Sequence, residues 1–327
     1  MLVTELLLSY YKTQCLYVIS ELDIANELRY GPKSAKHLAE FKSVNADKLY
    51  RILRFLASQG LFKENEEGLF ELNDESKKLL HNEESALKNF IKLHATCFYQ
   101  SAEEIINAIA TDASPFELKY NAGAHSYFLD NPMFGDMYNT AMSENSQCYS
   151  QLLLAIYDFS SYGKIIDIGG GFGTLLILIL QKYQNTIGIV FDLPQLKSKA
   201  EENIVSNRLG ERCRYISGSF FESIPEGGDI YILKAILHGK NDHMAMDILN
   251  NIKVSMKQDS KILIIDRLID RECDYELACI NDINMLNVTR GFDRTKQQFE
   301  CLIKACGLFI QNIYYLEDAH FCIEIQL

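Results

Sequence analysis

The sequence predicts an α/β fold built on a Rossmann-like, mostly parallel sheet, with an α-helical winged-helix domain before it. Three observations support this prediction. A strand, a glycine turn, a helix and a second strand follow one another near the middle of the chain, and short apolar strands alternate with helical segments after it. Three helical segments and a hairpin precede it. With 327 residues the chain is long enough for two domains, and a hydrophobic content of 48% is ample for a sizeable core.

The central unit spans residues 164–194. Ile165, Ile166 and Ile168 are β-branched and nearly contiguous, which suits a strand buried on both faces. Four glycines follow, and the unbroken apolar run at 175–180 predicts a buried helix. Residues 187–191 predict a second buried strand. Such a βαβ unit binds nucleotide-like ligands at the carboxyl end of its first strand.

The glycine turn favours a cationic ligand over a dinucleotide. A dinucleotide site has Gly-x-Gly-x-x-Gly with the pyrophosphate on the helix N-terminus, whereas this chain has Asp167-x-Gly169-x-Gly171-x-Gly173 and then Thr174. The acid would repel pyrophosphate but would suit the sulfonium and amino groups of S-adenosylmethionine. Asp192, which ends the second strand, is placed to accept hydrogen bonds from ribose hydroxyls. An ordinary tight turn in an α/β protein is the alternative for this stretch.

Composition argues against several classes of partner. The net charge of -12 argues against binding to nucleic acid or to an anionic membrane. No apolar run approaches the length that spans a bilayer, and no signal-peptide pattern opens the chain. The nine cysteines contain no Cys-x-x-Cys pair, which indicates reduced thiols. We therefore expect a cytoplasmic protein without a metal ion.

The first 72 residues predict a winged helix. Apolar residues at helical spacing predict one or two helices within residues 2–28, and Ser34 is placed to cap a short helix at 35–41. Asn45 or Asp47 could cap the next helix, which runs to Ser58 before Gly60. Residues 61–72 then predict a two-stranded hairpin.

A winged helix raises the possibility of DNA binding. The second helix of the pair carries three basic residues, but the hairpin carries three acids that would meet phosphate unfavourably. The basic residues are Lys48, Arg51 and Arg54, and the acids are Glu64, Glu66 and Glu67. We therefore favour a dimerisation or substrate-covering module over a DNA reader.

The segment between the two predicted domains is helical and rich in aromatic residues. Residues 84–112 predict further helix, Pro115 and the segment 121–123 a loop, and residues 151–159 a helix that leads to the central strand. Between them, residues 125–142 concentrate Tyr, Phe and Met. This concentration is either core packing, which composition alone favours, or one wall of an apolar ligand pocket.

The C-terminal half alternates strands with helices. We expect strands at 214–217, 229–233 and 261–266, helices at 197–208, 242–256, 276–288 and from Thr295 to 306, and a final hairpin of 308–315 with 320–325. Polar residues follow the strands, including Ser219, Lys234 and His238, and Asp266 ends one. The carboxyl edge of an open α/β sheet is where ligands bind.

Five motifs occur together in the order and spacing of one family. They are Asp-Ile-Gly-Gly-Gly-Phe-Gly at 167–173, Phe-Asp-Leu-Pro at 191–194, Gly-Ser-Phe-Phe-Glu-Ser-Ile-Pro at 218–225, Lys-x-x-Leu-His at 234–238 and Gly-Phe-Asp-Arg-Thr at 291–295. The chain resembles the class I methyltransferases, and among them the small-molecule O-methyltransferases of the caffeic-acid and hydroxyindole type with their bacterial antibiotic- and pigment-tailoring relatives. The resemblance covers nearly the whole chain.

The resemblance implies a division of labour between two domains. Residues 1–100 would form the winged-helix dimerisation domain, which in that family builds an intertwined homodimer. Residues 101–327 would form the S-adenosylmethionine-binding domain, within which residues 101–160 would be a helical connection that contributes to the substrate pocket. The partners implied are a small hydroxylated acceptor and a second copy of the chain.

The resemblance also implies roles for individual residues. Gly169 and Gly171 would lie against the methionine part of the cofactor, Asp192 would hold the ribose and Phe220 would pack on the adenine. The full cofactor set would be Asp167, Gly169, Gly171, Asp192, Ser219, Phe220, Lys234 and Met142. The substrate pocket would contain Tyr138, Met142, Asn145, Met285 and Thr289.

The same resemblance implies that His238 is the general base, oriented by Asp266 and Asp293. The chemistry agrees, because a phenol of pKa about 10 is a poor nucleophile at neutral pH. An imidazole of pKa near 6.5 held by carboxylates is a suitable base. Methyl transfer is an in-line displacement, so alignment of the reacting atoms does much of the work.

The chain departs from the family pattern around this base. It has His238-Gly239-Lys240 where the family commonly has His-Asp-Trp, and Ser219 where an acid contacts the adenine. Gly239 would open the pocket to a bulkier acceptor. Asp266 and Asp293 replace glutamates, and an aspartate is one methylene shorter. The histidine would therefore sit closer to them or be held through water.

These observations favour an S-adenosylmethionine-dependent O-methyltransferase that acts on an aromatic or polyketide-like hydroxyl. A second hypothesis keeps the cofactor and changes the chemistry to N- or C-methylation, decarboxylation or hydroxylation. A third is a catalytically silent cofactor-binding dimer or a winged-helix regulator.

Overall fold

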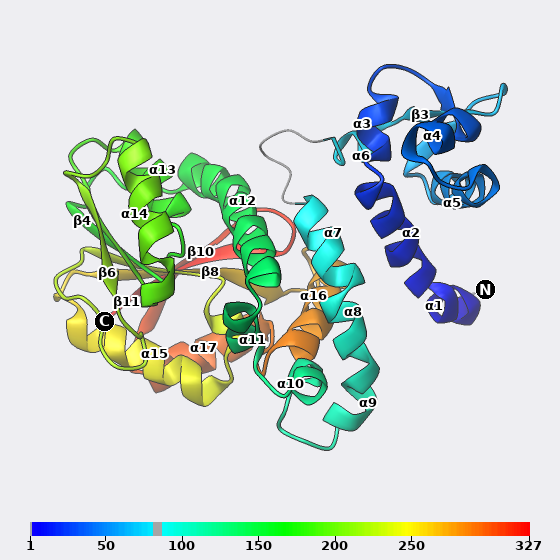
Figure 1. The fold of residues 1–327 in the computed structure, drawn as a ribbon. Helices are drawn as coiled ribbons and strands as arrows, with labels where there is room; N and C mark the ends of the chain where they lie inside the picture. Colours follow the sequence, from blue (N-terminus) through cyan, green and yellow to red (C-terminus); the bar gives the residue numbers. More distant parts are fainter. Residues whose placement is uncertain (1, 81–86) are drawn as a thin grey trace. The chain divides into compact units, whose positions relative to one another are not determined.

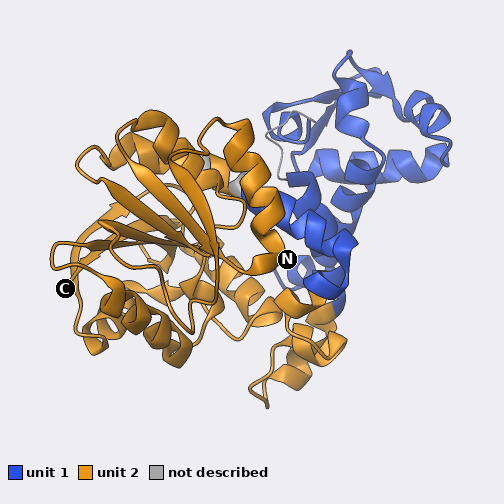
Figure 2. Cartoon of the chain, turned by 60° about the vertical axis from the view of Figure 1, so that its left-hand side comes forward, with its two compact units in different colours: residues 1–100, 128–144 blue, residues 101–127, 145–327 orange. Residues whose placement is uncertain are grey.

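The computed structural model describes residues 2–80 and 87–327, without the side chains of residues 144, 145 and 148. Contacts divide the chain into two compact units (Figure 2). One contains residues 1–100 and 128–144, and the other contains residues 101–127 and 145–327. The first unit thus contains the whole predicted dimerisation range together with residues 128–144. The domain ranges 1–100 and 101–327 stay a prediction, and we describe each unit by itself.

The first unit begins with helices and a small sheet. Its elements are α1 (Leu2–Leu8), α2 (Tyr10–Glu21), α3 (Ile24–Leu28), β1 (Lys33–Ser34), α4 (Ala35–Lys42), α5 (Ala46–Ser58), β2 (Phe62–Glu64), β3 (Leu69–Leu72) and α6 (Asp74–Lys77). The predicted caps are confirmed, because Ser34 accepts a hydrogen bond from the backbone N–H of His37 at 3.2 Å and Asn45 accepts one from that of Lys48 at 2.9 Å. The predicted hairpin of β2 and β3 is also confirmed.

The pairing of β1 with β3 adds a third strand that the sequence did not indicate. A two-residue strand has no periodicity of its own, so only its tertiary partner reveals it. Apolar residues from the helices and the hairpin form one core. Leu38, Leu53 and Phe70 are completely buried in it. This core is why the short helices and the hairpin hold together as a winged helix.

The helical segment that follows is more broken than expected. Its pieces are α7 (Leu87–Ala95), α8 (Cys97–Ser101), the 3₁₀ helix η1 (Ala102–Glu104) and α9 (Ile105–Ala108). The helical structure predicted for 84–112 is therefore confirmed, although it is divided into short pieces and ends at Ala108. Residues 84–86 of that range lie outside the described part of the chain. The hydroxyl of Thr96 donates to the carbonyl of Lys92 at 2.5 Å, a local bond of the kind that bends helices.

The loop predicted at Pro115 was wrong, whereas the loop predicted at 121–123 is confirmed. Residues Pro115–Tyr120 form the helix α10. Ser114 caps it and Glu117 returns the bond to the Ser114 backbone, while Pro115 occupies the first helical turn, where its missing N–H is harmless. Two helices follow, α11 (Ala124–Asp130) and the 25-residue α12 (Pro132–Ile156). The last turns of α12 correspond to the helix predicted at 151–159.

The second unit is built on one large sheet with the strand order β10-β11-β8-β7-β4-β5-β6. Its strands are β4 (Lys164–Ile168), β5 (Ile187–Asp192), β6 (Cys213–Ser217), β7 (Ile230–Lys234), β8 (Lys261–Ile269), β10 (Phe309–Tyr315) and β11 (His320–Gln326). The short β9 (Arg294–Thr295) pairs with β8 off this path. The strands from β6 to β8 run parallel, and β11 and β10 are antiparallel. The predicted α/β fold is confirmed.

Helices cover both faces of this sheet (Figure 1). They are α13 (Thr174–Lys182), α14 (Lys197–Ser206), α15 (Asp242–Ser255) and α17 (Lys296–Ala305), whereas α16 (Tyr275–Val288) contacts α10 and β8. One face packs against α15 and α17 and the other against α13, α14 and the end of α12, so each face has its own apolar core. Strands buried on both faces read as continuous apolar runs, which is why the sequence revealed them. Among the described helices, none has both the length and the apolar character needed to cross a membrane.

A buried ionic network joins the amino end of β8 to the antiparallel strand β11. Glu324 is 2% exposed, and its carboxylate pairs with the ammonium of Lys261. Asn312 donates to the same carboxylate at 2.8 Å and Tyr157 donates to it at 3.2 Å. The network satisfies a charge that burial would otherwise make very costly.

We predict that Lys261→Met lowers the free energy of unfolding by about 3 kcal/mol, because it leaves Glu324 buried without its counter-charge. Urea denaturation at neutral pH measures this loss. Lys257→Met is the matched control, because the ion pair of Lys257 with Asp229 lies at the surface and is worth less than about 1 kcal/mol. Equal losses in the two variants would show that the buried carboxylate does not depend on Lys261.

Candidate functional site

The glycine turn after β4 lies where the strand order reverses, because β4 is flanked by β5 on one side and by β7 on the other. Gly169 and Gly171 both have positive φ, of 67° and 57°. A Cβ on Gly169 would overlap Ile236, whereas a Cβ on Gly171 would meet nothing within 4 Å. The turn therefore needs glycine for its backbone and presents open space at Gly171, which suits close approach by a ligand.

Two carboxylates lie beside this turn. Asp192, at the end of β5, accepts hydrogen bonds from the backbone N–H groups of Gly171 at 2.8 Å and Leu193 at 2.7 Å. Burial raises the pKa of Asp192. Asp167 is 2% exposed, and burial raises its pKa to about 7, although Lys234 nearby opposes this rise. The site thus holds one carboxylate that changes charge near neutral pH.

The end of β6 adds an aromatic side chain. The ring of Phe220 lies 3.9 Å from the position of a Cβ on Gly169, and Asn251 donates to the Phe220 carbonyl at 2.9 Å. The Ser219 hydroxyl accepts a bond from the N–H of Phe221 at 3.3 Å. Asp167, Gly169, Gly171, Asp192, Ser219 and Phe220 therefore all lie on the ends of three adjacent strands.

Two residues near this edge were not predicted as site residues. The ammonium of Lys240 lies 5.9 Å from the centre of the Phe220 ring, and burial lowers its pKa. His125 of α11 lies near Asp192 and Lys240, and burial lowers its pKa. Sequence analysis placed His125 only within an aromatic run. The sole signal for Lys240 was its position beside His238, where the family commonly has tryptophan.

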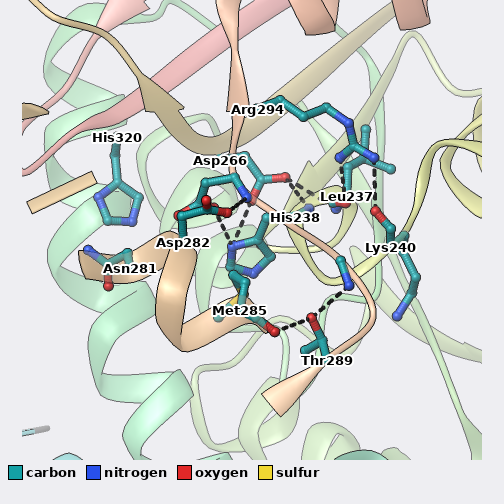
Figure 3. Close-up of polar contacts among 12 residues, drawn as sticks. Leu237, His238, Lys240, Asp266, Asn281, Asp282, Met285, Thr289, Arg294 and His320 are labelled. Carbon is teal, nitrogen blue, oxygen red and sulfur yellow. Dashed lines mark hydrogen bonds and ion pairs between the residues drawn. The ribbon is translucent and has the colours of Figure 1, made fainter. Parts of the chain in front are cut away.

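His238 lies in the 3₁₀ helix η3 (Leu237–Gly239), directly beyond β7. Its Nδ1 is 3.6 Å from Oδ1 of Asp266 and 3.4 Å from Oδ1 of Asp293 (Figure 3). These distances exceed those of a good hydrogen bond. Accordingly, within the described part of the chain Nδ1 and both Asp293 oxygens have no hydrogen-bond partner. The shorter aspartates thus reach the imidazole electrostatically rather than through direct bonds.

Asp266 also holds the backbone of the turn that carries His238. Its Oδ2 accepts bonds from the N–H groups of Leu237 and His238, both at 3.2 Å. Burial raises the pKa of Asp266, and the neighbouring Asp293 raises it further, while His238 opposes both. His238 therefore lies beside two buried acids, one of which also holds its backbone.

Arg294 fixes the same turn from the other side, as Figure 3 shows. It is 1% exposed and donates to the carbonyls of Leu237 and Lys240, both at 2.8 Å. It also donates to the carboxylate of Asp242 at 2.9 and 3.0 Å. The two carbonyls bracket His238 in the chain, so one guanidinium holds both ends of the turn. Sequence analysis quoted Arg294 within a motif but gave it no role.

The turn from Thr289 to Asp293 packs directly on the His238 backbone. A Cβ on Gly291 would overlap the backbone of His238, Gly239 and Lys240, so only glycine fits there. The Thr289 hydroxyl accepts from the N–H of Gly291 at 2.9 Å and donates to the Met285 carbonyl at 2.9 Å. Met285 and Thr289, both predicted pocket residues, are therefore connected to this turn.

Three further residues were predicted to contact the cofactor or the acceptor, and the structure does not place them beside the glycine turn or His238. Tyr138 and Met142 belong to the first unit, where Tyr138 stacks on Phe128 with ring centres 4.9 Å apart. The Asn145 side chain lies outside the described residues. The contacts predicted for these three with cofactor or acceptor stay predictions. No group of three or more His, Cys, Asp or Glu in the described parts of the chain is arranged to hold a metal ion.

Comparison with known proteins identifies the family to which the chain is similar. Residues 99–309 match the model of the O-methyltransferase domain, and residues 4–82 match that of the O-methyltransferase dimerisation domain. A mitomycin biosynthesis 6-O-methyltransferase from Streptomyces lavendulae is 30% identical over 312 residues, which cover 95% of this chain and 89% of that protein.

One relative and one solved structure extend the comparison. An 8-amino-8-demethylriboflavin N,N-dimethyltransferase from Streptomyces davaonensis is 27% identical over 315 residues, covering 94% of this chain and 90% of that protein. The solved structure of a mitomycin 7-O-methyltransferase superposes with a TM-score of 0.89 at 28% identity, covering 99% of this chain and 96% of that chain. Both matches extend over nearly the whole length.

The two family models together cover most of the chain, and the glycine turn with its acids is the kind of site that such an enzyme requires. The chain belongs to the O-methyltransferase family and is an S-adenosylmethionine-dependent O-methyltransferase with an N-terminal dimerisation domain.

Proposed function

We propose that this enzyme methylates a hydroxyl of an aromatic or polyketide-like small molecule and that His238 is its general base. The observation that carries the proposal is the placement of His238 between two buried carboxylates at the carboxyl edge of the sheet. Nδ1 faces Asp266 and Asp293, which leaves Nε2 for the acceptor hydroxyl. The imidazole takes the proton from the hydroxyl, and the two carboxylates stabilise the imidazolium that results.

The residues around the glycine turn fit the cofactor. Bound S-adenosylmethionine supplies a methyl group on a positively charged sulfur. The open space at Gly171 admits its methionine part, and Asp192 is placed for the ribose hydroxyls. Phe220 offers a ring for the adenine, Ser219 a hydroxyl, and Asp167 and Lys234 lie beneath the turn. Met142 is assigned to the cofactor on the resemblance alone.

The acceptor pocket is proposed to contain Tyr138, Met142, Asn145, Met285 and Thr289. Met285 and Thr289 support this best, because both connect to the turn that packs on His238. Gly239 has no side chain to fill the adjoining space, which suits a bulky acceptor. Aspartates in place of glutamates leave the base with longer contacts to its acids.

The dimerisation domain supports a homodimer. Residues of α1 and α2 leave a large apolar surface exposed in the single chain, including Leu2, Val3, Leu6, Leu7, Tyr10 and Tyr11. Monomeric proteins rarely expose such contiguous apolar patches. A cytoplasmic location and the lack of a nucleic-acid partner stay predictions from composition.

N-methylation is the second candidate, because one relative spanning nearly the whole chain is named as an N,N-dimethyltransferase. N-methylation would use the same cofactor site. The base would then accept a proton from the acceptor's amine instead of from a hydroxyl. Mass and NMR analysis of the product distinguish an O-methyl from an N-methyl group. C-methylation, decarboxylation, hydroxylation and a catalytically silent dimer have no observation in their favour.

We predict that His238→Ala lowers kcat by at least about a hundredfold, because the acceptor proton loses its base. The affinity for S-adenosylhomocysteine, measured by calorimetry, should stay within about twofold. His243→Ala is the matched control, because His243 is exposed on α15 and forms an ion pair with Asp247 there. Full turnover in His238→Ala would exclude this histidine as the base.

We predict that the affinity for S-adenosylhomocysteine falls about tenfold from pH 8 to pH 6. The raised pKa of Asp167, about 7, means that its carboxylate is charged at pH 8 and protonated at pH 6. A charged carboxylate attracts the ammonium group of the ligand and a neutral one does not. Calorimetric titration across this range should give a flat profile for Asp167→Asn. The same pH dependence in that variant would assign the titration to another group.

We predict that Arg294→Lys lowers kcat by about tenfold without abolishing cofactor binding. A lysine cannot reach both carbonyls that Arg294 holds, so the turn that carries His238 shifts, and small misplacements of catalytic groups are costly. The pH dependence of kcat should shift as well, because the imidazole moves relative to its acids. Asp242→Asn, which keeps both carbonyl bonds, should stay within about twofold of the wild type. An unchanged kcat and pH profile in Arg294→Lys would refute this positioning role.

A further inference from the structure

The two acids that face His238 are held in place in different ways. Asp266 is fixed through its own carboxylate, because its Oδ2 accepts bonds from the N–H groups of Leu237 and His238 at 3.2 Å. Asp293 is 1% exposed, and across the described residues neither of its carboxylate oxygens has a hydrogen-bond partner. The direction of the Asp293 side chain is therefore set by its backbone.

Asp282 of α16 holds that backbone. Its Oδ1 accepts a hydrogen bond from the N–H group of Asp293 at 2.9 Å. Figure 3 draws Asp282 in the view that contains His238 and Asp266. The contacts thus run from the carboxylate of Asp282 to the backbone of Asp293, and from the Asp293 carboxylate to Nδ1 of His238 at 3.4 Å.

The other contacts of this turn act on either side of Asp293. Gly291 packs against the backbone of η3, and the Arg294 guanidinium donates to two carbonyls of the histidine turn. The strand pairing of β9 with β8 begins at Arg294. The N–H group of Asp293 lies between these contacts, and its own acceptor is Asp282. Loss of this acceptor would free the residue whose carboxylate faces the base.

Asp282 also belongs to the helix that carries part of the proposed acceptor pocket. Met285 lies three residues further along α16, and Thr289 follows the last residue of the helix. Residues three, four or seven apart share one face of a helix. The same face of α16 thus carries Asp282, Met285 and Thr289. The bond from Asp293 to Asp282 therefore connects the acid beside the base to the acceptor side of the site.

The charge of Asp282 is not what makes this contact favourable. Burial raises the pKa of Asp282, and the nearby Asp293 raises it further, while the bond from the Asp293 N–H opposes both. Two neighbouring carboxylates repel each other, whereas a hydrogen bond from an N–H group to an oxygen is favourable with or without a charge. The useful part of the contact is therefore the hydrogen bond.

We propose that Asp282 is a positioning residue, whose hydrogen bond to the Asp293 backbone directs the Asp293 carboxylate at His238. The proposal rests on the proposed role of His238 as the base and adds a residue that acts through Asp293. Without this bond the Asp293 carboxylate, which accepts no other hydrogen bond among the described residues, turns away from Nδ1. The imidazolium then loses one of the two acids that stabilise it.

Proton uptake by His238 tests the proposal without turnover. The protein, labelled with ¹³C in its seven histidines and loaded with S-adenosylhomocysteine, is titrated by NMR, and His238→Ala identifies the resonance. Asp282→Ala should lower the titration midpoint of His238 by at least about half a pH unit, because a nearby negative charge favours the protonated imidazole.

Two further variants separate the hydrogen bond from the charge. Asp282→Asn keeps an acceptor oxygen without the charge, so its midpoint should stay within about 0.2 pH unit of the wild type. Asp282→Glu keeps the charge but moves the oxygens by one methylene, so it should shift the midpoint in the same direction as Asp282→Ala. Glu276→Ala is the matched control, because Glu276 is an exposed acid in the first turn of the same helix.

A double-mutant cycle tests the route through Asp293. In the Asp293→Asn background, Asp282→Ala should add no further shift, because the carboxylate that Asp282 positions is already neutralised. The affinity for S-adenosylhomocysteine, measured by calorimetry, should stay within about twofold in all Asp282 variants, since the proposed cofactor residues follow β4, β5 and β6.

Four results would overturn the proposal. They are an unchanged midpoint in Asp282→Ala, an unchanged midpoint in Asp282→Glu, a shift in Asp282→Asn as large as that in Asp282→Ala, and a full additional shift in the Asp293→Asn background. A shift in Asp282→Asn with a normal Asp282→Glu would assign the effect to charge. If all the shifts occur but no hydroxylated acceptor is methylated, the proposed function fails and the positioning of Asp293 stands.

Discussion

The buried guanidinium of Arg294 is the constraint on which the site depends. It ties the carbonyls of Leu237 and Lys240, on the two sides of His238, to the motif that also supplies Asp293. The neighbouring Gly291 packs without a side chain against the same backbone. Because a guanidinium donates in fixed directions, the histidine turn and the acid that faces it are positioned together. A shift in one would displace the other.

Electrostatics then divide the carboxyl edge of the sheet into regions. Acids follow β4 and β5 beside the glycine turn, where a positively charged ligand is expected. Acids on β8 and after α16 enclose the imidazole. Basic side chains on β7, β8 and β11 share one face at the same edge of the sheet. Burial raises the pKa of Asp167, Asp192 and Asp266 and lowers the pKa of Lys234 and His320. Charge complementarity with ligands therefore matters more here than it would at an exposed surface.

Sequence reasoning succeeded where the signal is local. The apolar runs of the parallel strands, the caps at Ser34 and Asn45, and the glycine turn each have a physical cause within a few residues. Sequence reasoning failed where a structural element depends on residues far away in the chain or where a helix breaks locally. The strand β1 exists only through its pairing with β3, and the helix predicted at 84–112 breaks into pieces. At Pro115, the capping box and the proline at the first helical turn were both readable but were not recognised.

The sequence by itself determined the fold class and the family resemblance. It also identified His238 as a candidate base with Asp266 and Asp293 as its acids. Both were possible because the five motifs occur in the family's order and spacing. Only the tertiary structure decided that the acids stand 3.4 and 3.6 Å from Nδ1, that Arg294 holds the turn, and that Lys234 and Arg267 share a face with His320. These facts depend on which strands are neighbours and how deeply each side chain is buried. Neither quantity is encoded in the spacing of residues along the chain, since residues far apart in sequence meet only when the sheet has formed.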